Sequence, residues 1–92
     1  EAGAAETGRP MAAERFAELV TSALYEVAPD LRGEPLDPAE RFNVQFEFDS
    51  MDFLKFIASL HRTTGLDLPE KDYPRLTSLK SAVGYLAEKL PP

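Results

Sequence analysis

The stretch Asp49-Ser50-Met51-Asp52 places one serine hydroxyl between two carboxylates. Aspartate and serine begin helices readily, because their side-chain oxygens accept hydrogen bonds from the free N–H groups of the first turn. A phosphate attached to Ser50 would meet the same N–H groups and the positive end of the helix dipole. The stretch therefore predicts either a plain helix cap or a serine that is presented for covalent modification.

A third possibility, a catalytic serine, is excluded by spacing. A serine nucleophile needs a neighbouring base that is itself oriented by a third group. The one histidine, His61, lies eleven residues further along the chain, which is about 16 Å in a helix that rises 1.5 Å per residue. The chain also has no cysteine. We therefore expect no catalytic residues, no enzyme activity and no metal site built from several histidines.

The apolar residues after Phe48 recur at helical spacing and predict a helix from Ser50 to Thr64, which Gly65 ends. Asp49 is the expected N-cap, and Asp52 completes a variant capping box with it. The expected core stripe of this helix is Phe53, Phe56, Ile57, Leu60 and Thr64. A second apolar stripe consists of Met51, Leu54 and Ala58. An apolar stripe that stays exposed beside the serine is typical of a docking face for another protein.

The rest of the chain predicts two more long helices and a short one. The first extends from Met11 to Ala28 and stops before a proline. Its expected core residues are Phe16, Leu19, Val20, Ala23, Leu24 and Val27. A short turn of helix is expected in PEKDY, and Thr77 or Ser78 caps the last helix. The core stripe of that helix is expected to be Leu79, Val83, Leu86 and Leu90. Three longer helices and one short helix, each with one apolar face, predict an all-α fold, a small four-helix bundle.

A long loop between the first and second long helices begins with PDLRGEPLDPAE. At its end, Phe42, Val44, Phe46 and Phe48 alternate with polar residues, which is the period of a strand. Because the chain offers no second strand to pair with it, we expect an extended segment. Its aromatic side chains would pin the loop onto the helices.

Residues 1–10 lack any large apolar residue and are expected to form a flexible N-terminal tail, with residues 11–92 as the helical domain. The formal net charge of −6 argues against nucleic-acid binding, which needs clustered basic residues. No apolar run approaches the roughly 20 residues of a membrane span, and the start of the chain does not resemble a signal peptide. We therefore expect a cytoplasmic monomer with basic protein partners.

Asp49-Ser50-Met51-Asp52 resembles the Asp-Ser-Leu-Asp attachment motif of acyl carrier proteins, whose serine is esterified by 4′-phosphopantetheine from coenzyme A. The predicted order of long helix, long loop, motif-led helix, short helix and final helix is similar to the four-helix bundle of that family, from about Met11 to Leu90. The stretches TTGLDLPEKDYPRL and TSLKSAVGYL are similar to the short-helix region and the last helix of the family.

The resemblance implies a carrier without catalytic activity of its own. Ser50 would receive the phosphopantetheine arm from a phosphopantetheinyl transferase. The terminal thiol of the arm would hold an acyl group as a thioester for acyl-processing or acyl-transferring enzymes, in fatty-acid, lipid or polyketide-type biosynthesis. Residues implied in recognition of the transferase and these partners are Asp49, Met51, Asp52, Leu54 and Ala58. A peptidyl or aminoacyl carrier and an unmodified helical interaction module are the alternatives.

The exposed side of the motif-led helix departs from the family pattern. Fatty-acid-type carriers commonly have Glu or Asp there, whereas this chain has Lys55, His61 and Arg62. Lys55 and Arg62 are either an ordinary solvated surface or part of partner recognition, with electrostatic steering unlike that of a general fatty-acid carrier. On the second interpretation, the chain is a specialised carrier that serves a dedicated pathway.

Overall fold

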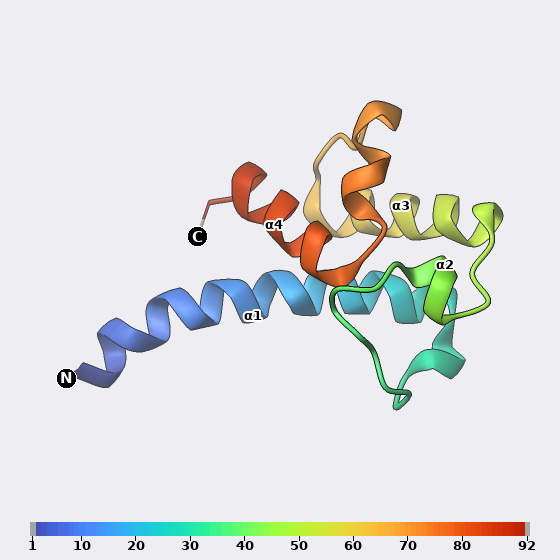
Figure 1. Cartoon of the computed structure of the whole chain (residues 1–92). Helices are drawn as coiled ribbons and strands as arrows, with labels where there is room; N and C mark the ends of the chain where they lie inside the picture. Colours follow the sequence, from blue (N-terminus) through green and yellow to red (C-terminus); the bar gives the residue numbers. More distant parts are fainter. Residues whose placement is uncertain (1, 92) are drawn as a thin grey trace.

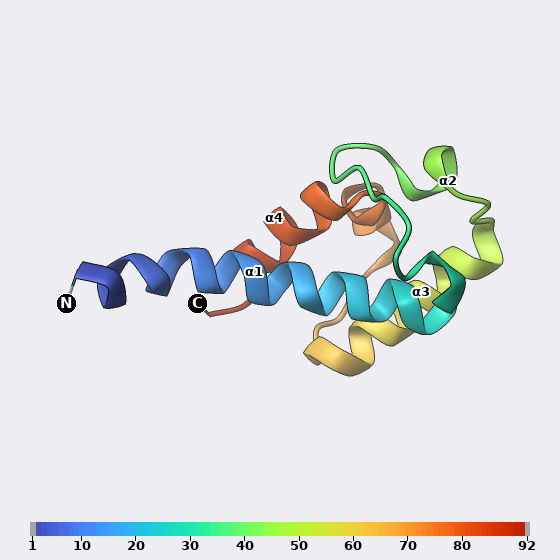
Figure 2. The ribbon, with the colours of Figure 1, turned by 90° about the horizontal axis from the view of Figure 1, so that it is seen from below.

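In the computed structural model of the chain, helix α1 is the element against which the other long helices pack (Figures 1 and 2). The elements in chain order are α1 (Ala2–Val27), the 3-10 helix η1 (Pro29–Leu31), α2 (Phe42–Gln45), α3 (Ser50–Thr64), the 3-10 helix η2 (Glu70–Leu76) and α4 (Leu79–Lys89). Both α3 and α4 run back along α1 in the opposite direction (Figure 1). Within the described residues every regular element is helical, which confirms the predicted small helical bundle.

The structure describes the backbone of residues 2–91 and the side chains of residues 13–91. Helix α1 begins at Ala2 and not at Met11, as predicted. The side chains of residues 1–10, where a flexible tail was predicted, lie outside the described range. The tail, and with it the domain boundary at residue 11, therefore stays a prediction.

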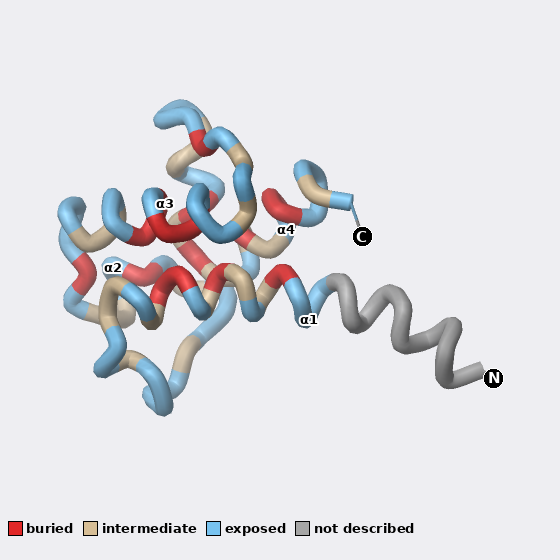
Figure 3. The backbone as a smooth tube through the Cα atoms, turned by 180° about the vertical axis from the view of Figure 1, so that it is seen from behind, coloured by how far each residue is buried: buried red, intermediate tan, exposed pale blue. Residues whose placement is uncertain are grey.

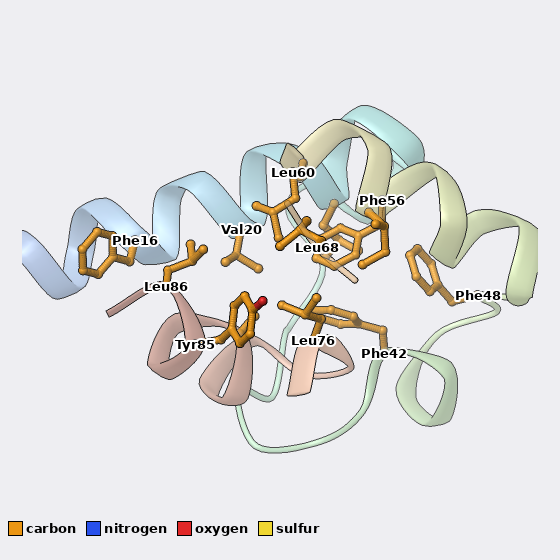
Figure 4. Packing of buried hydrophobic residues seen from close by; sticks show 14 residues of the cluster. Phe16, Val20, Phe42, Phe48, Phe56, Leu60, Leu68, Leu76, Tyr85 and Leu86 are labelled. Atoms are coloured by element: carbon orange, nitrogen blue, oxygen red, sulfur yellow. The ribbon is translucent and has the colours of Figure 1, made fainter. Parts of the chain in front are cut away.

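One face of each long helix contributes to a single core (Figures 3 and 4). The largest fully buried side chains are Val20, Leu24, Phe42, Phe56, Leu60, Leu76, Tyr85 and Leu86. The apolar stripes predicted for the first two long helices are buried or packed against this core, except that Thr64, at the end of the second, is only partly buried. Phe53 is less central than expected: it is only partly buried, and its ring packs edge-on against Tyr73 at 5.4 Å between ring centres.

The stripe predicted for α4 faces the core, but two residues outside it are buried more deeply. Leu86 is buried, and Leu79, Val83 and Leu90 pack against the core while partly buried. Ala82 and Tyr85, which the prediction did not include, are fully buried. A tyrosine suits a core position only where its hydroxyl finds a partner, and the hydroxyl of Tyr85 donates to Asp72 Oδ2 at 2.7 Å. Burial, together with this hydrogen bond, raises the pKa of Tyr85 to about 12. The phenol therefore stays protonated and links α4 to η2.

The segment from Phe42 to Phe48 was predicted to be extended. Its first part, Phe42–Gln45, instead forms the single helical turn α2, and Phe46, which follows, is extended. The alternating pattern misled because its members do not share one environment: Phe42 and Phe48 are buried, while Val44 is 54% exposed. The prediction that aromatic side chains pin the loop onto the helices is confirmed. Phe42 contacts Phe48 and Phe56 edge-on, with ring centres 5.8 and 5.4 Å away (Figure 4).

The side chain of Gln45 closes the loop on itself. Its Oε1 accepts from the N–H of Asp37, and its Nε2 donates to the carbonyl oxygens of Asp37 and Glu40, all at 2.9 Å. We call this arrangement of Asp37, Glu40 and Gln45 the Gln45 bracket. Beside it, the N–H of Phe42 donates to the carbonyl of Thr77 at 2.8 Å. These bonds satisfy backbone groups that have no partner within a regular helix or sheet, so an irregular segment is held firmly in place.

Pro74 does not end the short helix at Tyr73, as predicted, because η2 continues to Leu76. Pro74 lies inside this 3-10 helix and has no N–H to donate. The hydrogen bonds of a 3-10 helix have poorer geometry than those of an α-helix, so the loss of one costs less there. Leu76 is fully buried. Burial of this side chain therefore favours the continued helix over the local effect of the proline.

One carboxylate joins α1 to α3. Glu26 Oε1 accepts a hydrogen bond from the hydroxyl of Ser59, and Glu26 Oε2 forms an ion pair with Arg62 at 2.7 Å. Ser59 is only 2% exposed, whereas the side chain of Arg62 is 63% exposed. A buried hydroxyl depends on its acceptor, while water weakens an exposed ion pair. The contact with Ser59 is therefore the more important of the two for stability.

Replacing Glu26 with alanine is expected to lower the free energy of unfolding by about 1–2 kcal/mol, because the Ser59 hydroxyl loses its acceptor. Arg62→Ala removes only the exposed ion pair and is expected to cost less than about 1 kcal/mol. Urea unfolding followed by circular dichroism measures both variants. Equal losses would show that the Ser59 contact does not carry the larger share.

Candidate functional site

The first turn of α3 is held by a capping box between Asp49 and Asp52. Asp49 Oδ1 accepts from the N–H of Asp52 at 2.9 Å, and Asp52 Oδ2 accepts from the N–H of Asp49 at 3.2 Å. The predicted N-cap and capping box are therefore present. Gly65 ends the helix in the left-handed conformation, with φ of 75°. The helix that carries Ser50 thus has a defined start and a defined end.

Ser50 is the first residue of α3 and is exposed. Its hydroxyl makes no hydrogen bond to any side chain or backbone group of the described residues, so no protein contact competes with a bond formed there. His61 lies near the other end of the helix, where its Nδ1 is 2.6 Å from the carbonyl oxygen of Leu66. The structure therefore places no imidazole beside Ser50 that could activate it as a nucleophile.

A pocket of about 310 Å³ opens beside Ser50. Its lining residues are Arg41, Phe42, Asn43, Phe48, Asp49, Ser50, Phe53 and Thr77. Figure 4 shows Phe42 on α2 and Phe48 on the segment that leads into α3, with Phe56 close to both. The pocket therefore combines aromatic residues with a basic residue, Arg41, and an amide residue, Asn43, next to the serine.

Sequence reasoning did not find Arg41, Asn43 or Thr77 as neighbours of Ser50. Thr77 is distant in sequence and reaches the site only because its carbonyl accepts from Phe42. Arg41 and Asn43 alternate with aromatic residues, and in an extended segment they would have faced solvent. The sequence does show a basic residue and an amide residue on either side of Phe42. Their position next to Ser50 follows only from the folding of the loop onto α3.

The second apolar stripe of α3 is exposed, as predicted. Met51 is 63% exposed and Leu54 is 51% exposed, and Ala58 follows them on the exposed surface. Val44 of α2, 54% exposed, is a further large apolar side chain on the surface. Exposed apolar side chains grouped on one helix next to Ser50 favour a protein contact there.

The two basic residues predicted for partner recognition differ in their surroundings. Arg62 is paired with Glu26 and so contributes to the contact of α3 with α1. Lys55 is exposed and forms no ion pair with any described side chain. Of the two, Lys55 is the one whose charge is available to another molecule.

The described part of the chain shows neither a metal site nor a membrane helix. Among these residues, no group of three His, Asp or Glu side chains is placed to hold a metal ion. None of the helices, within the same residues, combines the length and the apolar character that crossing a bilayer requires.

Comparison with known proteins adds an independent observation. Residues 14–86 match the family model described as a phosphopantetheine attachment site. The chain is similar to an acyl carrier protein of Rubrobacter xylanophilus, with 26% identity over 74 residues, which cover 77% of this chain and 91% of that protein. No solved structure is significantly similar to the chain.

Proposed function

Because the chain belongs to the family of acyl carrier proteins and related phosphopantetheine attachment domains, we propose that Ser50 carries a 4′-phosphopantetheine arm and that the protein transports acyl intermediates on it as thioesters. The carrier role follows from the family. The choice of Ser50 is supported by one observation: it is an exposed serine hydroxyl without a protein partner, at the first position of a capped helix.

The residues around Ser50 suit a phosphodiester. The serine oxygen would bond to the 4′-phosphate while the adenosine bisphosphate portion of coenzyme A leaves and the hydroxyl proton passes to a base of the transferase. The N–H groups at the start of a helix have no partner within the helix and favour an attached phosphate. In α3 the N–H of Asp52 is already used by Asp49, which leaves those of Ser50 and Met51 for this role. When bound, the arm supplies a thiol that forms thioesters, and this chain has no cysteine of its own.

Asp49 and Asp52 have two compatible roles in this proposal. Their capping box fixes the start of α3, and with it the direction in which Ser50 faces. Their carboxylates also give a transferase with a basic surface an acidic target. Neither residue acts on the serine itself, so activation of the hydroxyl belongs to the transferase.

We propose that the cargo is an acyl group in fatty-acid, lipid or polyketide-type synthesis. We also propose that the protein is monomeric and cytoplasmic. The similarity to an acyl carrier protein favours this over a peptidyl or aminoacyl carrier. The free charge of Lys55 supports a specialised carrier, since it differs from the acidic surface that basic fatty-acid enzymes bind. Efficient use of the loaded protein by a housekeeping fatty-acid ketosynthase, measured in competition with that enzyme's own carrier, would refute the specialised role.

Intact-mass measurement tests the attachment directly. The protein is incubated with coenzyme A, Mg²⁺ and a phosphopantetheinyl transferase of broad specificity. We expect the mass to rise by one phosphopantetheine group. A chain that stays unmodified under conditions in which another carrier is loaded would refute the proposal and favour the unmodified interaction module.

We also propose that Met51, Leu54 and Ala58 form the contact with the transferase and the later partners. Leu54→Asp places a charge in this apolar contact and is expected to lower kcat/KM for loading about tenfold, which corresponds to about 1.4 kcal/mol. Ala87→Asp, on the exposed surface of α4, is the matched control and is expected to load normally. Equal rates for the two variants would place the contact elsewhere.

A further inference from the structure

The pocket beside Ser50 is lined by an arginine and three phenylalanines, a combination that the carrier role alone does not explain. We propose that it binds the first part of the phosphopantetheine arm, with Arg41 paired to the phosphate and the aromatic walls around the branched carbon segment that follows it. This inference rests on attachment of the arm to Ser50. It adds a resting position for the arm on this chain, and a role for Arg41.

The charges around Ser50 favour a cation close to an attached phosphate. A phosphodiester on Ser50 brings a negative charge to a position between Asp49 and Asp52, whose carboxylates form the capping box. A third negative charge there is unfavourable unless a cation lies nearby. Arg41 lines the same pocket as Ser50, is exposed, and forms no ion pair with any described side chain. A guanidinium with free N–H groups suits a phosphate because it donates two parallel hydrogen bonds.

The apolar walls of the pocket suit the part of the arm that follows the phosphate. Beyond its phosphate, the arm continues with a carbon that bears two methyl groups, before its first amide. Phe42, Phe48 and Phe53 line the pocket. The partly buried Phe53 offers that segment the accessible ring surface, because Phe42 and Phe48 are only 1% and 6% exposed. The volume of about 310 Å³ is at the lower end of the range for small-ligand sites, roughly 300–1,000 Å³. The pocket therefore suits the short branched segment next to Ser50.

The walls of the pocket are already in place. Phe42 is held by ring contacts to Phe48 and Phe56 and by the hydrogen bond from its N–H to Thr77. The Gln45 bracket holds the end of α2, the helical turn that begins at Phe42. A site that is formed before the arm arrives requires little ordering on binding, and tethering at Ser50 makes the contact intramolecular.

Phosphorus and proton NMR of the loaded protein test the inference. We expect the two methyl signals of the arm to show nuclear Overhauser contacts to the rings of Phe42, Phe48 or Phe53 and to move upfield from their positions in free coenzyme A. In the loaded Arg41→Gln variant, these contacts and the upfield shift should be lost, and the phosphorus signal should change. The loaded wild-type protein should also melt at a higher temperature than the unloaded one, and Arg41→Gln should reduce that difference.

Arg32→Gln is the matched control, because Arg32 is another exposed arginine of the long loop that stacks on Tyr25 instead of lining the pocket. It should keep the contacts and the shifts of the wild type. Absence of added mass would refute attachment itself. Added mass without methyl–ring contacts, or with contacts unchanged in Arg41→Gln, would overturn the proposed resting position and leave the carrier role intact.

Discussion

Replacing Ser50 with alanine is expected to abolish loading with phosphopantetheine. The hydroxyl oxygen is the atom that would bond to phosphorus, and alanine has no substitute for it. Under conditions in which the wild-type protein gains one phosphopantetheine group completely, intact mass spectrometry of Ser50→Ala should show only the unmodified chain. The loss is expected to exceed about 1,000-fold in rate, because no alternative group in the first turn of α3 can carry out the same step.

The structure makes this variant informative, because Ser50 does not hold the helix start together. Asp49 and Asp52 form the capping box through their own atoms, so the unfolding free energy of Ser50→Ala should stay within about 0.5 kcal/mol of the wild type. Ser22→Ala, which changes an exposed serine of α1, is the matched control and should load fully. Modification of Ser50→Ala would show that another residue is the attachment site.

Replacing Phe42 with alanine should cause the largest loss of stability among single truncations of the loop. Phe42 is 1% exposed and touches two other aromatic rings, so its removal leaves a cavity between the loop and α3. Truncation of a buried phenylalanine costs about 3–5 kcal/mol. A domain of this size is stable by only about 5–14 kcal/mol, so the urea midpoint should fall by a large fraction.

Val44→Ala tests whether burial causes that loss. Val44 belongs to the same helical turn but is 54% exposed, and its truncation should change the unfolding free energy by less than about 0.5 kcal/mol. Chemical denaturation at constant pH measures both variants. Similar losses in the two would mean that α2 is held by the turn itself and not by the aromatic contacts of Phe42.

The parts of the fold that were predictable from sequence are those set by local chemistry. The capping box of Asp49 and Asp52, the bounds of α3 and its stop at Gly65 depend on residues within a few positions of one another. The exposed stripe of Met51 and Leu54 follows from helical geometry once those bounds are known. Ser50 could therefore be placed at a helix start, and given an apolar neighbourhood, from sequence alone.

The remaining features depend on contacts between distant residues. The turn at Phe42 is stabilised by the carbonyl of Thr77, which no periodicity reveals. Tyr85 takes a core position because Asp72 accepts its hydroxyl hydrogen bond, although the residue types alone favoured a stripe of leucine and valine. The pocket beside Ser50 is formed by the same long-range contacts, so Arg41 had no visible connection to the serine before the fold was known.

The Gln45 bracket divides the long loop into two parts that differ in their tolerance of engineering. Residues 32–35 lie before the bracket and are all exposed, and Gly33 makes a turn there with φ of 91°. An inserted peptide at such a surface turn adds little closure entropy and leaves the bracket and its aromatic anchors in place. A fluorophore or affinity handle inserted at this turn would report on the carrier, or immobilise it, without altering the hydrogen bonds that hold the loop beside Ser50.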